Sequence, residues 1–199
     1  GSVRLARFDG EQLPDLNDKQ CPYVGLDAFR DRTFFFGREA DIQSLLAQLQ
    51  KAPLVVVLGA SGSGKSSLVI GGVLPAIASE APPPGLCVVP SFVPGNTVLK
   101  HLADAVRQSP CSVGAGVADE TAALRDDPGY LSSIVGGAGT QSVLITIDQF
   151  EEVFTLSDQA DREALVANIA ELLEAGRGHR VILTVREEFR SRIVGLQAL

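Results

Sequence analysis

The chain has few residues of the kinds that bind transition metals or form cross-links. Its 199 residues include three cysteines, Cys21, Cys87 and Cys111, and two histidines, His101 and His179. The cysteines show neither paired spacing nor a nearby histidine cluster, so we expect reduced thiols of an intracellular protein and no metal ligation by them. Neither histidine has a sequence neighbour that would make it a general base, which predicts structural or surface roles for both.

Long apolar runs and an excess of basic charge are also missing. No stretch approaches the roughly 18 apolar residues needed to cross a bilayer, and no basic segment followed by an apolar stretch stands at the N-terminus. We therefore expect a cytoplasmic protein without a membrane span. The net charge of −7 argues against a broad nucleic-acid-binding surface, although it is compatible with a local basic patch.

What the chain does contain is an alternation of short β-rich runs with longer helical or loop sequence. With 45% hydrophobic and 21% charged residues, it has the composition of a globular domain. The segments between the runs are too long for hairpins, and continuous apolar runs are typical of parallel strands buried on both faces. We therefore predict an α/β fold, a three-layer αβα sandwich with a mainly parallel sheet. The predicted strands are Leu54–Leu58, Leu86–Val89, Val143–Ile147 and Val181–Val185.

The remaining segments suggest how the chain is organised. Residues 1–36 lack a sustained period and are predicted to form an extended N-terminal arm, followed by a core over residues 37–199. Apolar spacing predicts helices over residues 38–50 and 161–175. Residues 109–139 are rich in Gly, Ala, Ser and Asp, so we expect a mobile insertion with weak helical patches near 118–126 and 130–135.

A glycine-rich run directly after the first predicted strand is the most informative motif. It matches the phosphate-binding pattern G-x-x-x-x-G-K-[ST] at every fixed position. Such a loop points its backbone N–H groups at phosphate; Lys65 would bridge the β- and γ-phosphates and Ser66 would ligate Mg²⁺. The alternative is an ordinary glycine-rich turn between strand and helix. The run comprises Gly59, Ala60, Ser61, Gly62, Ser63, Gly64, Lys65 and Ser66, with Ser67 next.

Acidic residues follow the third predicted strand. Asp148 ends that strand, where a P-loop protein needs a carboxylate for the Mg²⁺ shell. Glu151 and Glu152 come within one helical turn, where either could accept a proton from, or orient, the attacking water. Spacing does not choose between them. The alternatives are that Asp148 caps the next helix and that the two glutamates serve the helix dipole.

The fourth predicted strand ends at Arg186, which would place a fixed positive charge at the same rim of the sheet as the phosphates. Arg186 could therefore sense or stabilise the γ-phosphate. The alternative is an ion pair with Glu187, Glu188 or a neighbouring acid.

Five ordered motifs over residues 21–190 resemble the bacterial novel STAND NTPase family, relatives of the NACHT and apoptotic ATPases within the AAA-like P-loop (ASCE) group. They are Cys21-Pro22-Tyr23-Val24-Gly25-Leu26-Asp27-Ala28-Phe29, Phe35-Phe36-Gly37-Arg38-Glu39, the P-loop, Ile147-Asp148-Gln149-Phe150-Glu151-Glu152, and Leu183-Thr184-Val185-Arg186-Glu187-Glu188-Phe189.

The resemblance implies a particular site and strand order. Phe36, Gly37 and Arg38 would lie near the adenine, and Asp148 with Glu151 or Glu152 would form the acidic catalytic pair. Arg186 would be the first sensor. The ligands would be ATP or ADP with Mg²⁺, and the strands would follow the order 1-4-3-2.

The resemblance also implies a setting. Similar proteins are signalling switches in bacterial conflict or signal transduction, inactive with ADP and oligomeric with ATP, carrying an N-terminal effector and C-terminal sensor repeats. This chain ends at Leu199, soon after the sensor strand, whereas the family usually continues through a fifth strand and a lid. We therefore expect part of a larger protein, with an exposed sheet edge, weak nucleotide affinity and little turnover.

Our main hypothesis is a slow Mg²⁺-dependent ATPase that works as a switch. Two alternatives stay open. A small-molecule kinase could use the same P-loop, but it would need an acceptor pocket and usually a mobile arginine-bearing lid. A non-catalytic scaffold could bind nucleotide and oligomerise without chemistry.

Overall fold

A computed structural model of the chain describes residues 37–79, 85–112, 119–135 and 142–196. The predicted N-terminal arm, residues 1–36, lies outside the described residues. At the centre is a four-stranded sheet, parallel throughout, in the order β1-β4-β3-β2. The predicted fold class and strand order are therefore confirmed. The strands are β1 (Leu54–Gly59), β2 (Leu86–Val88), β3 (Ser142–Ile147) and β4 (Arg180–Arg186).

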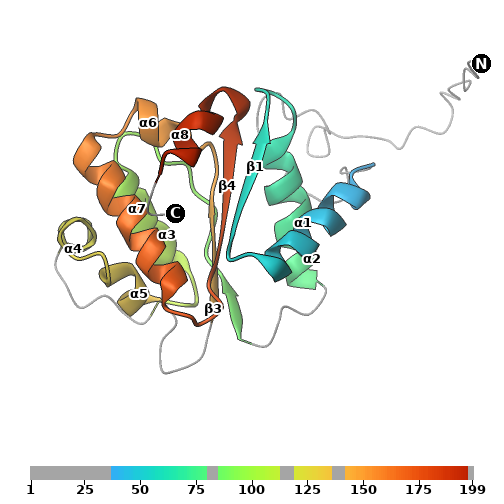
Figure 1. Ribbon diagram of the computed structural model, residues 1–199. Helices are drawn as coiled ribbons and strands as arrows, with labels where there is room; N and C mark the ends of the chain where they lie inside the picture. Colours follow the sequence, from blue (N-terminus) through green and yellow to red (C-terminus); the bar gives the residue numbers. More distant parts are fainter. Residues whose placement is uncertain (1–36, 80–84, 113–118, 136–141, 197–199) are drawn as a thin grey trace, which may run out of the picture.

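Helices cover both faces of this sheet, which gives three layers (Figure 1). One face carries α1 (Glu39–Lys51), the π-helix η3 (Ser67–Val73) and α2 (Leu74–Ser79). The other carries α3 (Val98–Gln108), α4 (Glu120–Asp126), α5 (Tyr130–Ile134) and α7 (Gln159–Glu174). The short α6 (Glu152–Thr155), η4 (Glu187–Phe189) and α8 (Arg190–Val194) complete the chain. Among the described segments, no helix is both long and apolar enough to cross a bilayer.

The strand side chains divide between two cores because successive residues of a strand point to opposite faces. On β3, Leu144 packs with the α1–η3 side, whereas Val143 and Ile145 pack with the α3–α7 side. On β4, Ile182 and Leu183 divide in the same way. Both faces are buried, which explains why the strands read as continuous apolar runs rather than as alternating ones.

A buried asparagine joins the helices that lie within residues 109–139. Asn168 of α7 is fully buried, and its Nδ2 donates to Leu124 O at 2.7 Å and to Ala164 O at 2.9 Å. Its Oδ1 accepts from Leu131 N at 3.1 Å. The two weak helical patches that the sequence predicted here are α4 and α5, and this asparagine holds both against α7.

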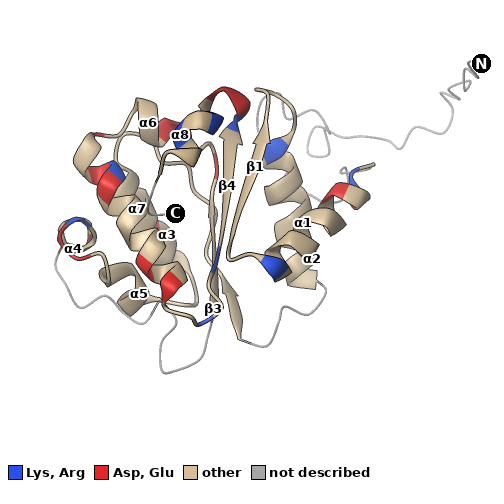
Figure 2. Ribbon diagram, in the orientation of Figure 1, with Lys and Arg blue, Asp and Glu red and all other residues tan. Residues whose placement is uncertain are grey.

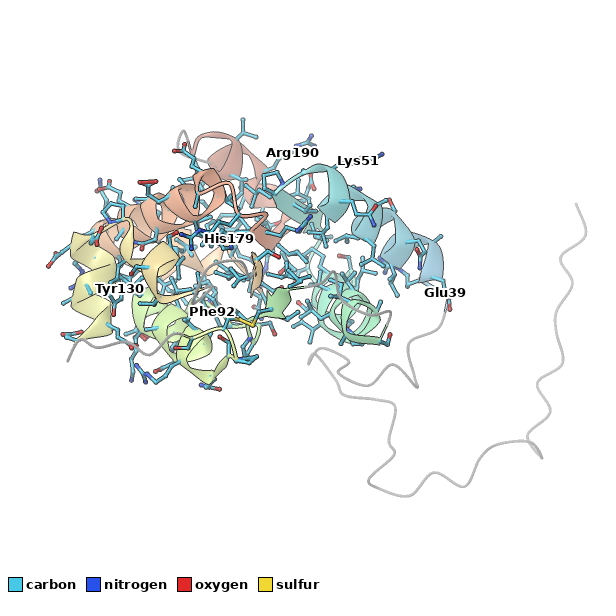
Figure 3. The ribbon with its side chains drawn as sticks, turned by 90° about the horizontal axis from the view of Figure 1, so that it is seen from below. Glu39, Lys51, Phe92, Tyr130, His179 and Arg190 are labelled. Carbon is cyan, nitrogen blue, oxygen red and sulfur yellow. A yellow bond between two sulfur atoms is a disulfide. The ribbon has the colours of Figure 1, made fainter. Side chains whose placement is uncertain are left out.

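The cysteines differ from their prediction. Cys87 and Cys111 form a disulfide, with Cα atoms 5.8 Å apart (Figure 3), while Cys21 lies outside the described residues. Cys87 is the middle residue of β2, and Cys111 follows α3, which returns along the sheet to bring the two together. A sequence separation of 24 resembles no metal-ligand or redox motif, so the spacing of the cysteines did not predict the disulfide. The expectation of reduced thiols is therefore wrong for Cys87 and Cys111, and this pair does not argue for an intracellular location.

Candidate nucleotide-binding site

The glycine-rich loop joins β1 to the helix that begins at Lys65, as the sequence predicted. Gly62 and Gly64 have φ of +72° and +80°, a region in which side chains are strained and glycine is not. The Leu68 N–H donates to Gly64 O at 2.8 Å, which closes the first helical turn. The loop therefore presents backbone N–H groups at the amino end of a helix, the arrangement that binds phosphate.

Lys65 is folded back onto this loop. Its Nζ donates to Gly59 O at 2.9 Å and to Ala60 O at 2.8 Å. Lys65 also lines two cavities. One, of about 370 Å³, lies between α1 and β1, and the second, of about 340 Å³, lies beside the acidic motif after β3. An ammonium group that already rests on carbonyls next to an open cavity can exchange them for phosphate oxygens.

The second cavity, which we call the phosphate cavity, brings together residues from three parts of the sequence. The loop contributes Lys65 and Ser66, the segment after β3 contributes Glu151, and β4 contributes Arg186. The strand register aligns Gly59 of β1 with Arg186 of β4, so the loop and the arginine leave the sheet side by side. The remaining lining residues are Ser61, Gly62, Gly64, Ser67, Gln149 and Thr184.

Asp148 follows β3 and is held by two hydroxyl groups. Ser66 Oγ donates to Asp148 Oδ1 at 2.7 Å, and Thr184 Oγ1 donates to the same oxygen at 2.5 Å. The helix-capping alternative is not what the structure shows, because α6 has Glu151 at its N-cap position with no side-chain capping bond. Asp148 instead links the loop to the acidic motif, as a carboxylate of a metal shell would.

The residues Ser66 and Asp148 also suit the ion that the sequence implies. Both offer oxygen atoms, the donors that Mg²⁺ prefers, and Mg²⁺ usually takes one or two protein ligands together with water and phosphate oxygens. Within the described residues, no cluster of three or more His, Cys, Asp or Glu side chains could hold a metal unaided. The donor set therefore fits Mg²⁺ bound together with a nucleotide.

Glu151 and Arg186 form an ion pair at the phosphate cavity. Arg186 Nε lies 3.0 Å from Glu151 Oε1, and the Arg186 backbone N–H donates to Oε2 at 3.2 Å. The Glu151 side chain is 7% exposed and that of Arg186 is 43% exposed. The carboxylate is thus buried, and its guanidinium partner reaches solvent. The predicted alternative of an ion pair for Arg186 is realised with Glu151, rather than with Glu187 or Glu188.

Glu152 has a different environment, although it is the next residue. Its Oε2 accepts from the backbone N–H of Gly95 at 3.0 Å, and it does not line the phosphate cavity. Gly95 has φ of +59°, and a Cβ there would lie 3.1 Å from the His101 ring. The geometry therefore distinguishes two glutamates that spacing could not: Glu151 lines the cavity, and Glu152 of α6 binds the loop between β2 and α3.

Arg38 approaches the loop from the start of α1. Its Nη1 lies 3.5 Å from Ser63 O, and its guanidinium pairs with Asp41. Gly37 N donates to Glu39 Oε1 at 3.2 Å, while Phe36 lies outside the described residues. Gly37 and Arg38 thus lie near the P-loop, but an adenine contact for residues 36–38 stays a prediction.

Sequence reasoning missed Thr184 and Gly95 as members of this neighbourhood. Thr184 carries a signal in the sequence, because it is a hydroxyl residue within the aliphatic run of β4. In the structure it is fully buried. Buried hydroxyls are normally hydrogen-bonded, so a hydroxyl in a strand expected to be buried predicts a hydrogen-bond partner nearby. Gly95 offered no comparable signal, because only the fold brings residues 95 and 152 together.

Comparisons with known proteins found a family model that matches this chain and solved structures that are similar to it. The family model described as Novel STAND NTPase 1 matches residues 22–199. Among solved structures, the Walker-type ATPase PABY2304 of Pyrococcus abyssi has a TM-score of 0.51 at 19% identity, covering 86% of this chain and 49% of that protein. The ORC2 protein of Aeropyrum pernix, solved as ADPNP–ADP complexes, has a TM-score of 0.47 at 14% identity, covering 88% and 48%. A search of curated proteins found no match.

A parallel α/β sheet with a P-loop after its first strand and an acidic motif after the strand that follows α5 defines a P-loop NTPase domain. The chain belongs to the novel STAND NTPase 1 family, a family of nucleotide-binding NTPases. It spans about half the length of the two solved structures just described.

Proposed function

We propose that this chain binds ATP and ADP with Mg²⁺ and hydrolyses ATP slowly. In this proposal it is the nucleotide switch of a larger cytoplasmic signalling protein, with an N-terminal effector, C-terminal sensor repeats and ATP-dependent self-assembly. The observation that carries the proposal is the convergence of Lys65, Ser66, Glu151 and Arg186 on one cavity of about 340 Å³. Family membership supports nucleotide binding, and the signalling setting is what the resemblance implies.

The chain's own groups divide the work as follows. Backbone N–H groups of the loop would hold the phosphates, and Lys65 would exchange its bonds to Gly59 O and Ala60 O for phosphate oxygens. Ser66 and Asp148 would hold Mg²⁺, which when bound neutralises phosphate charge. Arg186 would contribute a further positive charge beside the terminal phosphate.

Glu151 is the residue that we assign to the attacking water. It faces the phosphate cavity, whereas the carboxylate of Glu152 is bound to Gly95 N. A general base must be within reach of the proton that it abstracts, so geometry favours Glu151. Its pairing with Arg186 supports slow hydrolysis, because the guanidinium would have to move off the buried carboxylate before Glu151 could accept a proton.

Calorimetric titration with ADP and with Mg-ATP tests the site without requiring turnover. We expect saturable binding by the wild-type chain and at least about a 100-fold loss in the Lys65→Ala variant, since one charged phosphate contact disappears. Lys100→Ala is the matched control, because Lys100 is exposed on α3 and should leave affinity unchanged. Equal affinity of wild type and Lys65→Ala would refute the assignment of the phosphate site.

A further inference from the structure

Thr184 is an unusual residue in its strand. It lies in β4 between Leu183 and Val185, and it is fully buried. Because side chains alternate along a strand, Thr184 shares a face with Ile182, which packs with the core on the side of η3. A hydroxyl group is therefore buried on the same side of the sheet as the helix that follows the phosphate loop.

This single residue contacts three consecutive residues of the acidic motif. Its Oγ1 donates to Asp148 Oδ1 at 2.5 Å and accepts from Gln149 N at 2.9 Å. Its carbonyl oxygen accepts from Phe150 N at 2.9 Å. Gln149 has φ of +53°, a left-handed conformation that is unusual for a residue with a side chain. Thr184 thus holds the chain at the point where it turns out of β3.

The two donors to Asp148 differ in how firmly they are placed. Thr184 belongs to β4, which is paired on one side with β1 and on the other with β3. Ser66 lies in the first turn of the helix after the P-loop, and its hydroxyl is also the group that would serve Mg²⁺. A hydroxyl that gives a lone pair to a metal keeps its O–H donor, so both hydroxyls could still donate to Asp148, and Thr184 is the donor fixed within the paired strand.

We propose that Thr184 is a positioning residue for the Mg²⁺ site, acting through Asp148. The inference rests on the proposed nucleotide-binding function and adds to it a residue that need not touch nucleotide. Partners that orient metal ligands typically change metal affinity by about 10- to 100-fold when removed. The hydroxyl of Thr184 should therefore govern how strongly Mg²⁺ enhances nucleotide binding.

A purely structural role would leave a different signature. If Thr184 serves only to satisfy Gln149 N, its loss would lower the thermal midpoint and weaken binding equally with and without Mg²⁺. The ratio of the affinity with Mg²⁺ to the affinity without it distinguishes a positioning role from a structural one. Phosphate contacts of the P-loop contribute to both affinities and cancel in this ratio.

The chain offers a matched control on the neighbouring strand. Thr146 of β3 is also fully buried, and its Oγ1 has no hydrogen-bond partner among the described residues. Thr146→Val removes a buried threonine hydroxyl without touching Asp148. Thr184→Val removes the hydroxyl in question at nearly constant shape, Thr184→Ala removes it with less bulk, and Thr184→Ser keeps it.

The experiment is calorimetric titration of the chain with β,γ-imido-ATP in excess Mg²⁺ and again in EDTA. We expect Thr184→Val and Thr184→Ala to lose about tenfold or more of the Mg²⁺ enhancement, with EDTA affinity within about twofold of wild type. Thr184→Ser and Thr146→Val should retain the enhancement. Circular dichroism establishes folding, and Thr184→Ala provides the measurement where Thr184→Val fails to fold.

Three outcomes would overturn the inference. These are an intact Mg²⁺ enhancement in Thr184→Ala, an equal loss in Thr184→Ser, or an equal loss in Thr146→Val. Failure of the proposed function looks different, because a wild-type chain that binds the analogue in neither Mg²⁺ nor EDTA lacks a nucleotide site altogether.

Discussion

The two faces of the sheet are built in different ways. The face covered by α3, α4, α5 and α7 is filled by a continuous apolar core that contains a disulfide and the buried Asn168. The face covered by α1 and η3 has a smaller core. A hollow of about 370 Å³ lies beside that core, and the phosphate cavity of about 340 Å³ opens at the carboxyl ends of the strands.

This difference indicates that one face mainly stabilises the fold and that the other mainly binds ligand. On the filled face, the side chain of the buried Asn168 has protein partners for both its Nδ2 and its Oδ1. At the phosphate cavity, Lys65 rests on carbonyls of its own loop and Arg186 is nearly half exposed. Beyond the end of β4, the acidic residues of η4 are followed by the basic residues of α8 (Figure 2). Changes at the cavity should therefore alter binding and chemistry, and changes on the filled face should alter the free energy of unfolding.

The largest effect is expected at Glu151. Glu151→Gln keeps the side chain's size but removes its basicity, so we expect the hydrolysis rate to fall about 100-fold or more, equivalent to about 3 kcal/mol. The thermal midpoint should change little. Phosphate release measured under single-turnover conditions checks this.

Glu152→Gln is the control, because Glu152 is bound to Gly95 N away from the cavity. A rate loss in Glu152→Gln equal to that in Glu151→Gln would contradict the assignment. The ion pair adds a sharper test with β,γ-imido-ATP and ADP. Glu151→Gln should release Arg186 and raise the preference for the triphosphate, and that gain should vanish when Arg186→Gln is combined with it.

The disulfide should have the next largest effect, and on stability alone. Cys87 and Cys111 have a sequence separation of 24, and a cross-link that closes a loop of this length contributes about 3 kcal/mol in the chain-entropy model. Urea unfolding of oxidised and reduced protein in a Cys21→Ser background measures the difference. Two free thiols in the non-reduced form of that variant would show that the pair does not form.

Asn168 provides a smaller test of the same face. Asn168→Ala leaves the buried Leu131 N–H and Leu124 O without their partner, which should cost about 2 kcal/mol. Glu171→Ala is the control, because Glu171 is exposed on the same helix. Urea midpoints compare the two, and both variants should bind ADP like wild type. A loss of ADP affinity in folded Asn168→Ala would mean that the two faces are coupled.

The predictability of the two faces from sequence differs as well. The strands and the P-loop follow from local patterns, namely apolar runs and a glycine-rich loop before a helix, whereas the strand order was implied by the family resemblance. The motif Asp148 to Glu152 was likewise recognised, but spacing did not distinguish Glu151 from Glu152. That choice depends on Arg186 and Gly95, which only the packed sheet brings to opposite sides of the motif.

The pairs that the sequence did not predict have one feature in common. Cys87 with Cys111 and Thr184 with Asp148 are distant in sequence and are joined by the crossing of helices over parallel strands. Taken alone, each of these four residues can be explained by its local sequence, as a small buried residue or as a strand residue, without any partner. Such pairs become visible once the strand register is known.

The smallest predicted effect concerns His179, at the amino end of the sheet opposite the phosphate cavity. His179 is 2% exposed, and its Nδ1 accepts from Val143 N at 3.1 Å (Figure 3). Burial lowers the pKa of His179 below its ordinary value of 6.5, and the positive charge of Arg177 lowers it further. Protonation also removes the lone pair that accepts the bond, so the folded state favours neutral imidazole.

The sign of the pH dependence follows from this lowered pKa. The unfolded chain takes up the proton first as the pH falls, so the contribution of His179 is complete above about pH 6.5 and is lost below it, down to the folded pKa. Urea unfolding at pH 7.5 and 5.5 should show a decrease of up to about 1 kcal/mol. His179→Asn, whose Oδ1 can accept from Val143 N without titrating, should flatten that decrease. Equal decreases in both proteins would show that other groups cause the acid sensitivity, whereas a flattened profile with unchanged ADP affinity at pH 7.5 would place His179 among the residues that stabilise the fold without serving the site.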